Sequence, residues 1–95
     1  MAGRYKPNHS ELQKQAKEYL QLKGWSVMWH QAGLGTYEGI SDLSAIKNGV
    51  TIYVEIKTEN DRLSKKQREF KEMIEQNGGT FIEYRRLEDL TERGI

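Results

Sequence analysis

Cysteine is absent from the sequence, and its absence excludes several kinds of protein. Without cysteine a protein has no disulfide framework, no thiolate metal site and no thiol nucleophile. A chain without thiols fits a reducing compartment, so we expect a cytoplasmic protein.

Long apolar stretches and a strong charge imbalance are absent as well. No apolar run approaches the roughly 20 residues of a membrane span, and residues 1–8 lack the apolar stretch of a secretory signal. We therefore expect no membrane partner. The formal net charge is only +1. Acidic residues of a metal site can offset basic residues elsewhere, so the distribution of charge is more informative than the sum.

The 95 residues form one predicted domain, without internal repeats or low-complexity segments. A domain of this size buries a smaller fraction of its surface than a larger one does. A second copy of the chain or a nucleic-acid partner would add buried surface. We assign residues 1–9, which are polar and include His9, to a flexible arm, and residues 10–95 to the domain.

Two capping patterns predict the two long helices. Ser10 and Gln13 are spaced as a capping box before apolar residues at helical spacing, and Gly24 ends this helix. Ser64 and Gln67 form a second box at the start of the other helix. Strands are predicted over residues 25–30, 40–47, 50–57 and 80–84, and a short last helix over residues 87–93. The predicted order is therefore α-β-β-β-α-β-α.

Asn48-Gly49 lies between two runs of alternating apolar residues, which is the strongest short signal for a β-hairpin. Counting back from a two-residue turn places Asp42 opposite Glu55. Directly opposed residues have Cβ atoms roughly 4.5–5.5 Å apart, and like charges there are destabilising. Lys57 emerges on the same face as Glu55, because strand side chains alternate. A divalent cation would relieve the repulsion between the carboxylates, and a site of this kind can hydrolyse phosphodiesters.

The second strand of the hairpin has one apolar face and one more polar face. Glu55 and Lys57 share the polar face with Thr51 and Tyr53. The apolar face consists of Val50, Ile52, Val54 and Ile56. This pattern is typical of a sheet that is covered by helices and carries its chemistry at one rim.

Five segments match a known family in order, spacing and expected secondary structure. They are Ser10-Glu11-Leu12, Gly39-Ile40-Ser41-Asp42-Leu43, Val54-Glu55-Ile56-Lys57, Leu63-Ser64-Lys65-Lys66-Gln67 and Tyr84-Arg85-Arg86. The chain resembles the VRR-NUC (virus-type replication-repair nuclease) domain family, a branch of the PD-(D/E)XK restriction-endonuclease-like superfamily, and most of all its compact stand-alone phage members. There are two departures: Ser41 replaces the proline of the superfamily, and Tyr84 replaces the valine of the family motif.

The resemblance implies an α/β fold with a restriction-endonuclease-like α-β-β-β-α-β core, in which helices flank a small mixed sheet. It implies a metal-dependent endodeoxyribonuclease that acts as a homodimer on branched DNA, such as four-way (Holliday) junctions, in DNA repair. The expected partners are DNA and a second copy of the chain, without a small-molecule cofactor. The expected location is the cytoplasm of a bacterium or of a phage-infected cell.

Asp42 and Glu55 are the predicted metal ligands, and the resemblance adds the backbone carbonyl of Ile56. Hard oxygen donors favour Mg²⁺, with Mn²⁺ as a substitute, over zinc. Lys57 would lie beside the attacking water or the scissile phosphate and offset developing negative charge. Whether Lys57 itself is the general base stays open.

Glu11 and Gln67 have a structural and a functional interpretation each. Glu11 could favour the helix dipole, but the resemblance makes it a catalytic acid that binds a metal-bound water or a second ion. Glu18, two turns further, is the alternative helix-borne acid. Gln67 could cap the helix at Ser64, and the resemblance assigns it to the active site. One amide cannot serve fully in both roles, and we favour the role of Gln67 in the active site.

Basic residues near the expected rim are candidate phosphate contacts. They are Arg62, Lys65, Lys66, Arg85 and Arg86, with Arg68 and Lys71 nearby. Several of them could instead form ordinary surface ion pairs, which contribute little. We assign Gly33-Leu34-Gly35 to a loop that approaches DNA, and His30 to a strand end rather than to catalysis.

Two other functions remain open at this point. A non-catalytic DNA-binding accessory module of replication or recombination would share the basic residues, but would not require Asp42, Glu55 and Lys57 together. A nuclease domain that is active only within a larger complex would keep all three.

Overall fold

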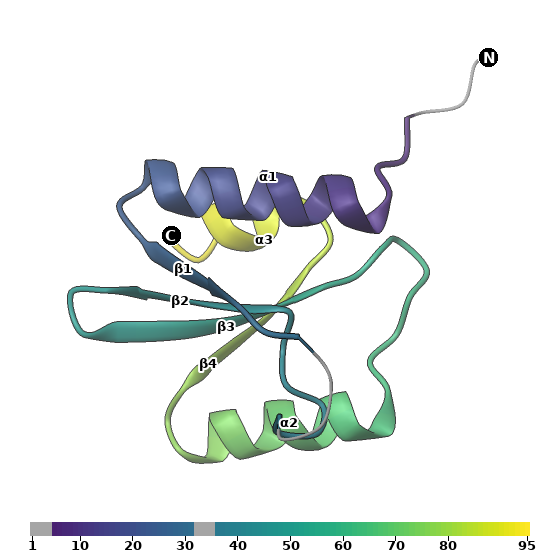
Figure 1. The fold of residues 1–95 in the computed structure, drawn as a ribbon, viewed down its shortest axis with the longest axis vertical. Coiled ribbons are helices and arrows are strands. Elements are labelled where there is room, and N and C mark those ends of the chain that lie inside the picture. The colour runs from purple at the N-terminus through teal and green to yellow at the C-terminus, as the bar shows by residue number, and fades with distance from the viewer. Residues whose placement is uncertain (1–4, 32–35) are drawn as a thin grey trace.

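The structure, a computed structural model, describes residues 5–31 and 36–95. Gly33-Leu34-Gly35, predicted to lie in a loop near DNA, falls outside the described residues. In the described part of the chain, the elements follow the predicted order (Figure 1). They are α1 (His9–Leu22), β1 (Ser26–Trp29), β2 (Leu43–Lys47), β3 (Val50–Ile56), α2 (Lys65–Gln76), β4 (Thr80–Tyr84) and α3 (Glu88–Thr91). None of the helices in residues 5–31 and 36–95 is long and apolar enough to cross a membrane.

The strands form one mixed sheet in the order β1-β2-β3-β4. β1 and β3 each pair antiparallel with β2, and β4 pairs parallel with β3 after the crossover through α2. The predicted hairpin register is confirmed, since Lys47 pairs with Val50. Asn48 and Gly49 have φ angles of 50° and 80°, as a type I′ turn requires. The predicted fold class, a small mixed sheet flanked by helices, is therefore confirmed.

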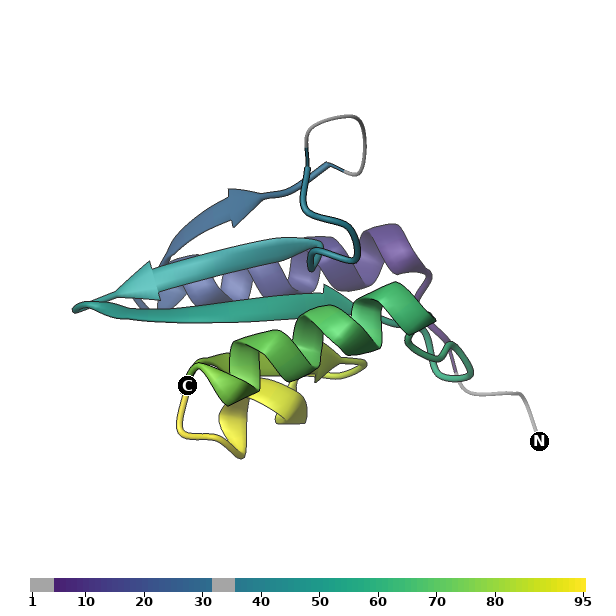
Figure 2. The same ribbon diagram turned by 90° about the horizontal axis from the view of Figure 1, so that it is seen from below.

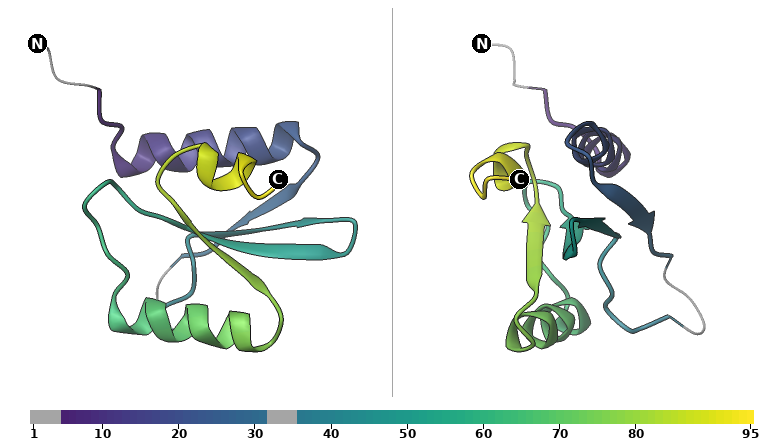
Figure 3. Two further views of the ribbon diagram at one scale, coloured as in Figure 1. Left: turned by 180° about the vertical axis from the view of Figure 1, so that it is seen from behind. Right: turned by 90° about the vertical axis from the view of Figure 1, so that its left-hand side faces the viewer.

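Helices cover both faces of this sheet. α1 and α3 lie on one side and α2 lies on the other (Figure 1 and Figure 3). On the α1 side, Leu12, Ala16 and Leu20 pack in one buried cluster with Val54 of β3 and Ile82 of β4. The apolar periodicity of α1 and the alternation of β3 thus meet in the main core.

A smaller aromatic cluster fills the space between α2 and the sheet. The ring of Phe70 lies edge-on to Tyr53 of β3 and Phe81 of β4, with centroid distances of 5.5 and 6.0 Å. Tyr37, from the segment before β2, packs against the same ring at 5.6 Å. Both faces of β3 are therefore covered, including the face that carries Glu55.

The predicted apolar face of β3 is confirmed for Ile52, Val54 and Ile56, which are buried. Val50 was expected on this covered face, but 53% of it is exposed. Val50 adjoins the Asn48-Gly49 turn, where the hairpin extends beyond the helices (Figure 2).

The predicted start of α1 is wrong by two residues. Asn8, not Ser10, is the N-cap, and its capping-box partner is Glu11 instead of Gln13. Asn and Ser are about equally good N-caps, so the local pattern allowed both. As a result, His9 is the first residue of α1 and does not belong to a flexible arm. The capping box at the start of α2 is confirmed.

The segment before β2 is a packed loop, although a strand was predicted from residue 40. Ile40 N–H donates to the Tyr37 carbonyl over 3.1 Å in a turn. Gly39 has a φ of 77° and lies against the start of α2, where a Cβ would come within 2.1 Å of the Lys66 carbonyl oxygen. Glycine allows this close approach, which lies three residues before Asp42 in the chain.

Candidate active site

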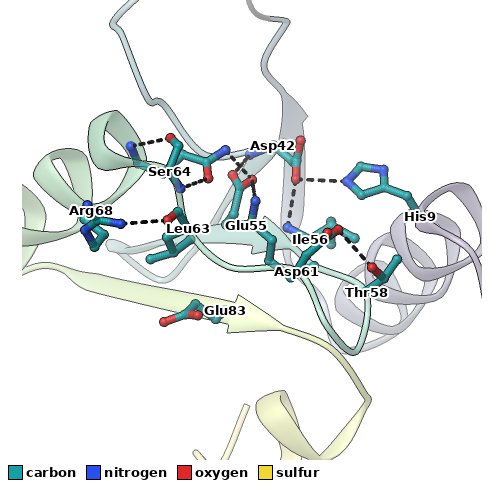
Figure 4. Close-up of polar contacts among 12 residues, drawn as sticks. His9, Asp42, Glu55, Ile56, Thr58, Asp61, Leu63, Ser64, Arg68 and Glu83 are labelled. Atoms are coloured by element: carbon teal, nitrogen blue, oxygen red, sulfur yellow. Dashed lines mark hydrogen bonds and ion pairs between the residues drawn. The ribbon is translucent and has the colours of Figure 1, made fainter.

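Asp42 and Glu55 lie side by side at one end of the hairpin, as the predicted register requires. Asp42 directly precedes β2, and its backbone N–H donates to Oε1 of Glu55 over 3.1 Å. In return, the backbone N–H of Ile56 donates to Oδ2 of Asp42 over 2.8 Å (Figure 4). The two carboxylates are thus held by reciprocal hydrogen bonds between neighbouring strands. Ser41, which replaces the proline of the superfamily, is buried and donates its hydroxyl to the Leu43 carbonyl.

Glu55 is a buried carboxylate, with only 4% of the residue exposed. Burial, followed by the nearby charge of Asp42, raises the pKa of Glu55 to about 7, although Lys57 lowers it in part. A carboxyl with such a pKa binds a proton easily in the absence of a cation. Strongly shifted groups of this kind are concentrated at functional sites.

Lys57 lies on the same face as Glu55, as predicted. Its Nζ is 3.7 Å from Oε2 of Glu55, and 12% of its side chain is exposed. The Lys57 backbone N–H donates to the Tyr84 carbonyl of β4, which fixes the chain just after β3. Two acidic groups and one ammonium group therefore converge at this rim of the sheet.

Gln67 joins this group from the first turn of α2. Its Nε2 donates to Oε2 of Glu55 over 3.0 Å, while its Oε1 accepts from the Ser64 backbone N–H over 2.9 Å. The sequence-based view that one amide could not fill both roles was wrong. The two ends of the amide serve the cap and the site separately.

The chain matches a known protein family over most of its length. The family model for the VRR-NUC domain matches residues 7–85 of the 95-residue chain. The chain belongs to the VRR-NUC domain family. This is a nuclease-type family, which implies DNA as the substrate. A search of curated proteins gave no significant match.

In this VRR-NUC domain, the Glu11 side chain forms hydrogen bonds at the start of α1. Its Oε1 accepts from the Asn8 backbone N–H over 3.0 Å, and its Oε2 accepts from the Tyr5 hydroxyl. Within residues 5–31 and 36–95, no hydrogen bond or ion pair joins Glu11 or Glu18 to Asp42. Glu11 is therefore placed as a capping residue, and its predicted catalytic role stays a prediction.

His9 reaches the site, although the sequence reasoning placed it in the arm. Its Nε2 is 3.5 Å from Oδ2 of Asp42 (Figure 4). A helix start at Asn8 would have indicated that His9 is helical, but its proximity to Asp42 depends on how α1 packs on the sheet. His30, by contrast, contacts Ser44 through Nε2 over 2.9 Å, and its backbone N–H donates to the Asp42 carbonyl.

The donor set of the VRR-NUC site fits a hard divalent cation in part. Asp42, which is partly exposed, and the buried Glu55 supply two carboxylates, and a cation stabilises two neighbouring acids. The described residues contain no cluster of three or more acidic, histidine or cysteine side chains around one metal position. Backbone carbonyl and water ligands would have to complete the shell, which suits Mg²⁺ better than zinc.

The predicted phosphate contacts fall into two groups. Arg85 is held by Glu83 over 3.0 Å and by the Asp61 carbonyl over 2.5 Å, and Lys66 pairs with Glu38 and Glu69. Arg62, Lys65 and Arg86 are exposed and form no ion pair within the described residues. These three side chains can therefore reach an external phosphate without first breaking an internal contact.

Proposed function

We propose that this VRR-NUC domain is a divalent-metal-dependent DNA endonuclease. The observation that supports the proposal best is the Asp42–Glu55 pair, in which each acid is held by a backbone N–H beside the other. A purely structural strand end has no need of a buried carboxylate next to a second one, because the two acids repel each other and the Lys57 ammonium, 3.7 Å from Glu55, compensates this in part.

In the proposed site, Asp42, Glu55 and the carbonyl of Ile56 would hold Mg²⁺ or Mn²⁺. When bound, such a cation would polarise the scissile phosphate and lower the pKa of the attacking water. The ammonium group of Lys57 offsets negative charge that develops on the phosphate oxygens. The Nε2 of Gln67 holds Glu55 in place by donating to the Oε2 of Glu55. Displacement of the 3′ oxygen leaves a 5′-phosphate on the product.

The test is a panel of labelled branched and linear DNAs, incubated with Mg²⁺, with Mn²⁺ and with a chelator. We expect cleavage only with metal and preferentially on four-way junctions. Binding without product in either metal would instead support a non-catalytic DNA-binding accessory module.

The variant Asp42→Ala sharpens this test. It removes a metal ligand and no phosphate contact, so we expect cleavage to be lost while DNA binding, measured by fluorescence anisotropy, persists. Cleavage by Asp42→Ala at the wild-type rate would contradict the proposed site.

We further propose that two copies of the chain act together, since two sites related by two-fold symmetry suit a substrate that is cut on paired strands. β1 is an edge strand, and Met28 of β1 and Ile46 of β2 are 46% and 41% exposed on the sheet face that carries Glu55. A second copy would cover these side chains. Light scattering that detects only monomer, with and without DNA, would contradict the dimer.

A further inference from the structure

The start of α2 is connected to Glu55 through a single side chain. Gln67 occupies the N3 position of the capping box, and its Oε1 accepts from the Ser64 backbone N–H over 2.9 Å. The Nε2 of the same amide donates to Oε2 of Glu55 over 3.0 Å. Oε1 of Glu55 accepts from Asp42 N–H, so each oxygen of this carboxylate has a donor.

An amide group has an acceptor end and a donor end, and it can rotate between two opposite orientations. Only one orientation of Gln67 satisfies both neighbours. In the reversed orientation, its NH₂ would face the Ser64 N–H, and its carbonyl oxygen would face the carboxylate of Glu55. Both neighbours therefore favour the same orientation, and the Ser64 N–H anchors the acceptor end of the amide that holds Glu55.

We propose that Ser64 is a positioning residue of the site: its backbone N–H orients the Gln67 amide, which in turn holds the Glu55 carboxylate ready for a cation. This inference rests on the proposed metal site. The Ser64 hydroxyl has a different task, because it accepts from the Gln67 backbone N–H over 3.1 Å and caps the helix. The two parts of Ser64 can therefore be tested separately.

The variants Ser64→Ala and Ser64→Pro separate them. Ser64 has φ −68° and ψ 170°, which proline adopts without strain. Alanine removes the hydroxyl and keeps the N–H, whereas proline removes both. We expect both variants to lower the melting temperature. Only Ser64→Pro should weaken Mn²⁺ binding in calorimetry, by about 10- to 100-fold, as loss of a partner that supports a metal ligand does.

Asn77→Ala is the matched control for a general weakening of α2. Asn77 caps the other end of the helix, where its Nδ2 donates to the Met73 carbonyl over 2.8 Å. We expect this variant to lower the melting temperature without changing the affinity for Mn²⁺. An equal loss of affinity in Asn77→Ala and Ser64→Pro would overturn the proposal, because the effect would then come from helix stability.

A double-mutant cycle tests whether Ser64 acts through Gln67. Since Gln67→Ala removes the amide that Ser64 orients, adding Ser64→Pro should weaken Mn²⁺ binding no further. Additive losses would overturn the proposal. If Ser64→Pro does not fold, amide hydrogen exchange replaces it: the Ser64 amide hydrogen should exchange slowly in the wild type and faster in Gln67→Ala. Fast exchange in the wild type would contradict the proposed contact.

The outcomes also distinguish this inference from the proposed function. A wild-type protein that binds neither Mn²⁺ nor Mg²⁺ would contradict the metal site itself. A wild-type protein that binds Mn²⁺, with a Ser64→Pro variant that binds it equally well, would contradict only the role of Ser64.

Discussion

Glu55 of β3 and Glu83 of β4 are paired in the parallel register of the sheet. The charged groups around the two carboxylates nevertheless differ. Burial alone would raise the pKa of Glu83, but hydrogen bonds from Arg85 and Lys71 outweigh it and lower the pKa. Glu55 is more deeply buried and has Asp42 beside it, and its pKa rises to about 7.

The difference separates an acid that is compensated within the fold from the acid that we propose as a metal ligand. Glu83 is compensated inside the fold, by Lys71 at 3.1 Å and Arg85 at 3.0 Å. Glu55 has one ammonium group, at 3.7 Å, and a second acid next to it. A fold that keeps an undercompensated carboxylate gives up stability, which is typical of sites that bind a cation or a substrate.

The largest expected effect is on catalysis, and it should appear when Glu55 is replaced but not when Glu83 is. Glu55→Gln removes a proposed metal ligand while keeping its shape, so cleavage of branched DNA should fall by about a thousandfold or more, equivalent to several kcal/mol. Glu83→Gln should retain most of the activity, because Glu83 has its partners within the fold. Equal losses in single-turnover assays of the two variants would remove the distinction.

The next effect is on the pH dependence of stability in the presence of a chelator. The pKa of Glu55 is about 7 in the fold, against 4.5 for the unfolded group. Between these values the folded protein keeps a proton that the unfolded chain has lost, so the free energy of unfolding falls as the pH rises. The loss is on the order of 3 kcal/mol, and urea unfolding at pH 5 and pH 8 measures it.

Glu55→Gln serves as the control, because it cannot ionise and should lose most of this pH dependence. Affinity for Mn²⁺ should change in the opposite direction in the wild type, rising with pH up to about 7, since cation binding displaces the proton. An unchanged slope of stability in Glu55→Gln would mean that another group titrates in this range.

The smallest effect concerns Glu83. The fold lowers the pKa of Glu83, so Glu83 stabilises the fold at pH values above the pKa that it has in the unfolded chain. This contribution is lost as the pH falls through the pKa that Glu83 has in the folded protein. Glu83→Gln should therefore destabilise the protein at pH 7 by on the order of 1 kcal/mol, since its ion pairs are partly exposed. Thermal unfolding at pH 7 with a chelator tests the sign: Glu83→Gln should melt at a lower temperature than the wild type.

Much of the fold followed from local sequence signals. Asn48-Gly49 predicted the turn and its register, and the register predicted that Asp42 meets Glu55. The box of Ser64 and Gln67 predicted the start of α2. The start of α1 was missed because Asn8 and Ser10 are comparable N-caps, so the local free energies of the two possible helix starts differ little.

The amino-acid sequence by itself determined the order of the elements, the hairpin register and the pairing of the two acids, because these depend on side-chain period and turn chemistry over short distances along the chain. Only the tertiary structure decided which acid is compensated. The packing of α2 against β3 and β4 brings Gln67 to Glu55 and Lys71 to Glu83, and the packing of α1 brings His9 to Asp42. These contacts join residues far apart in the chain, and burial, which raises the pKa of Glu55, exists only once the layers have packed.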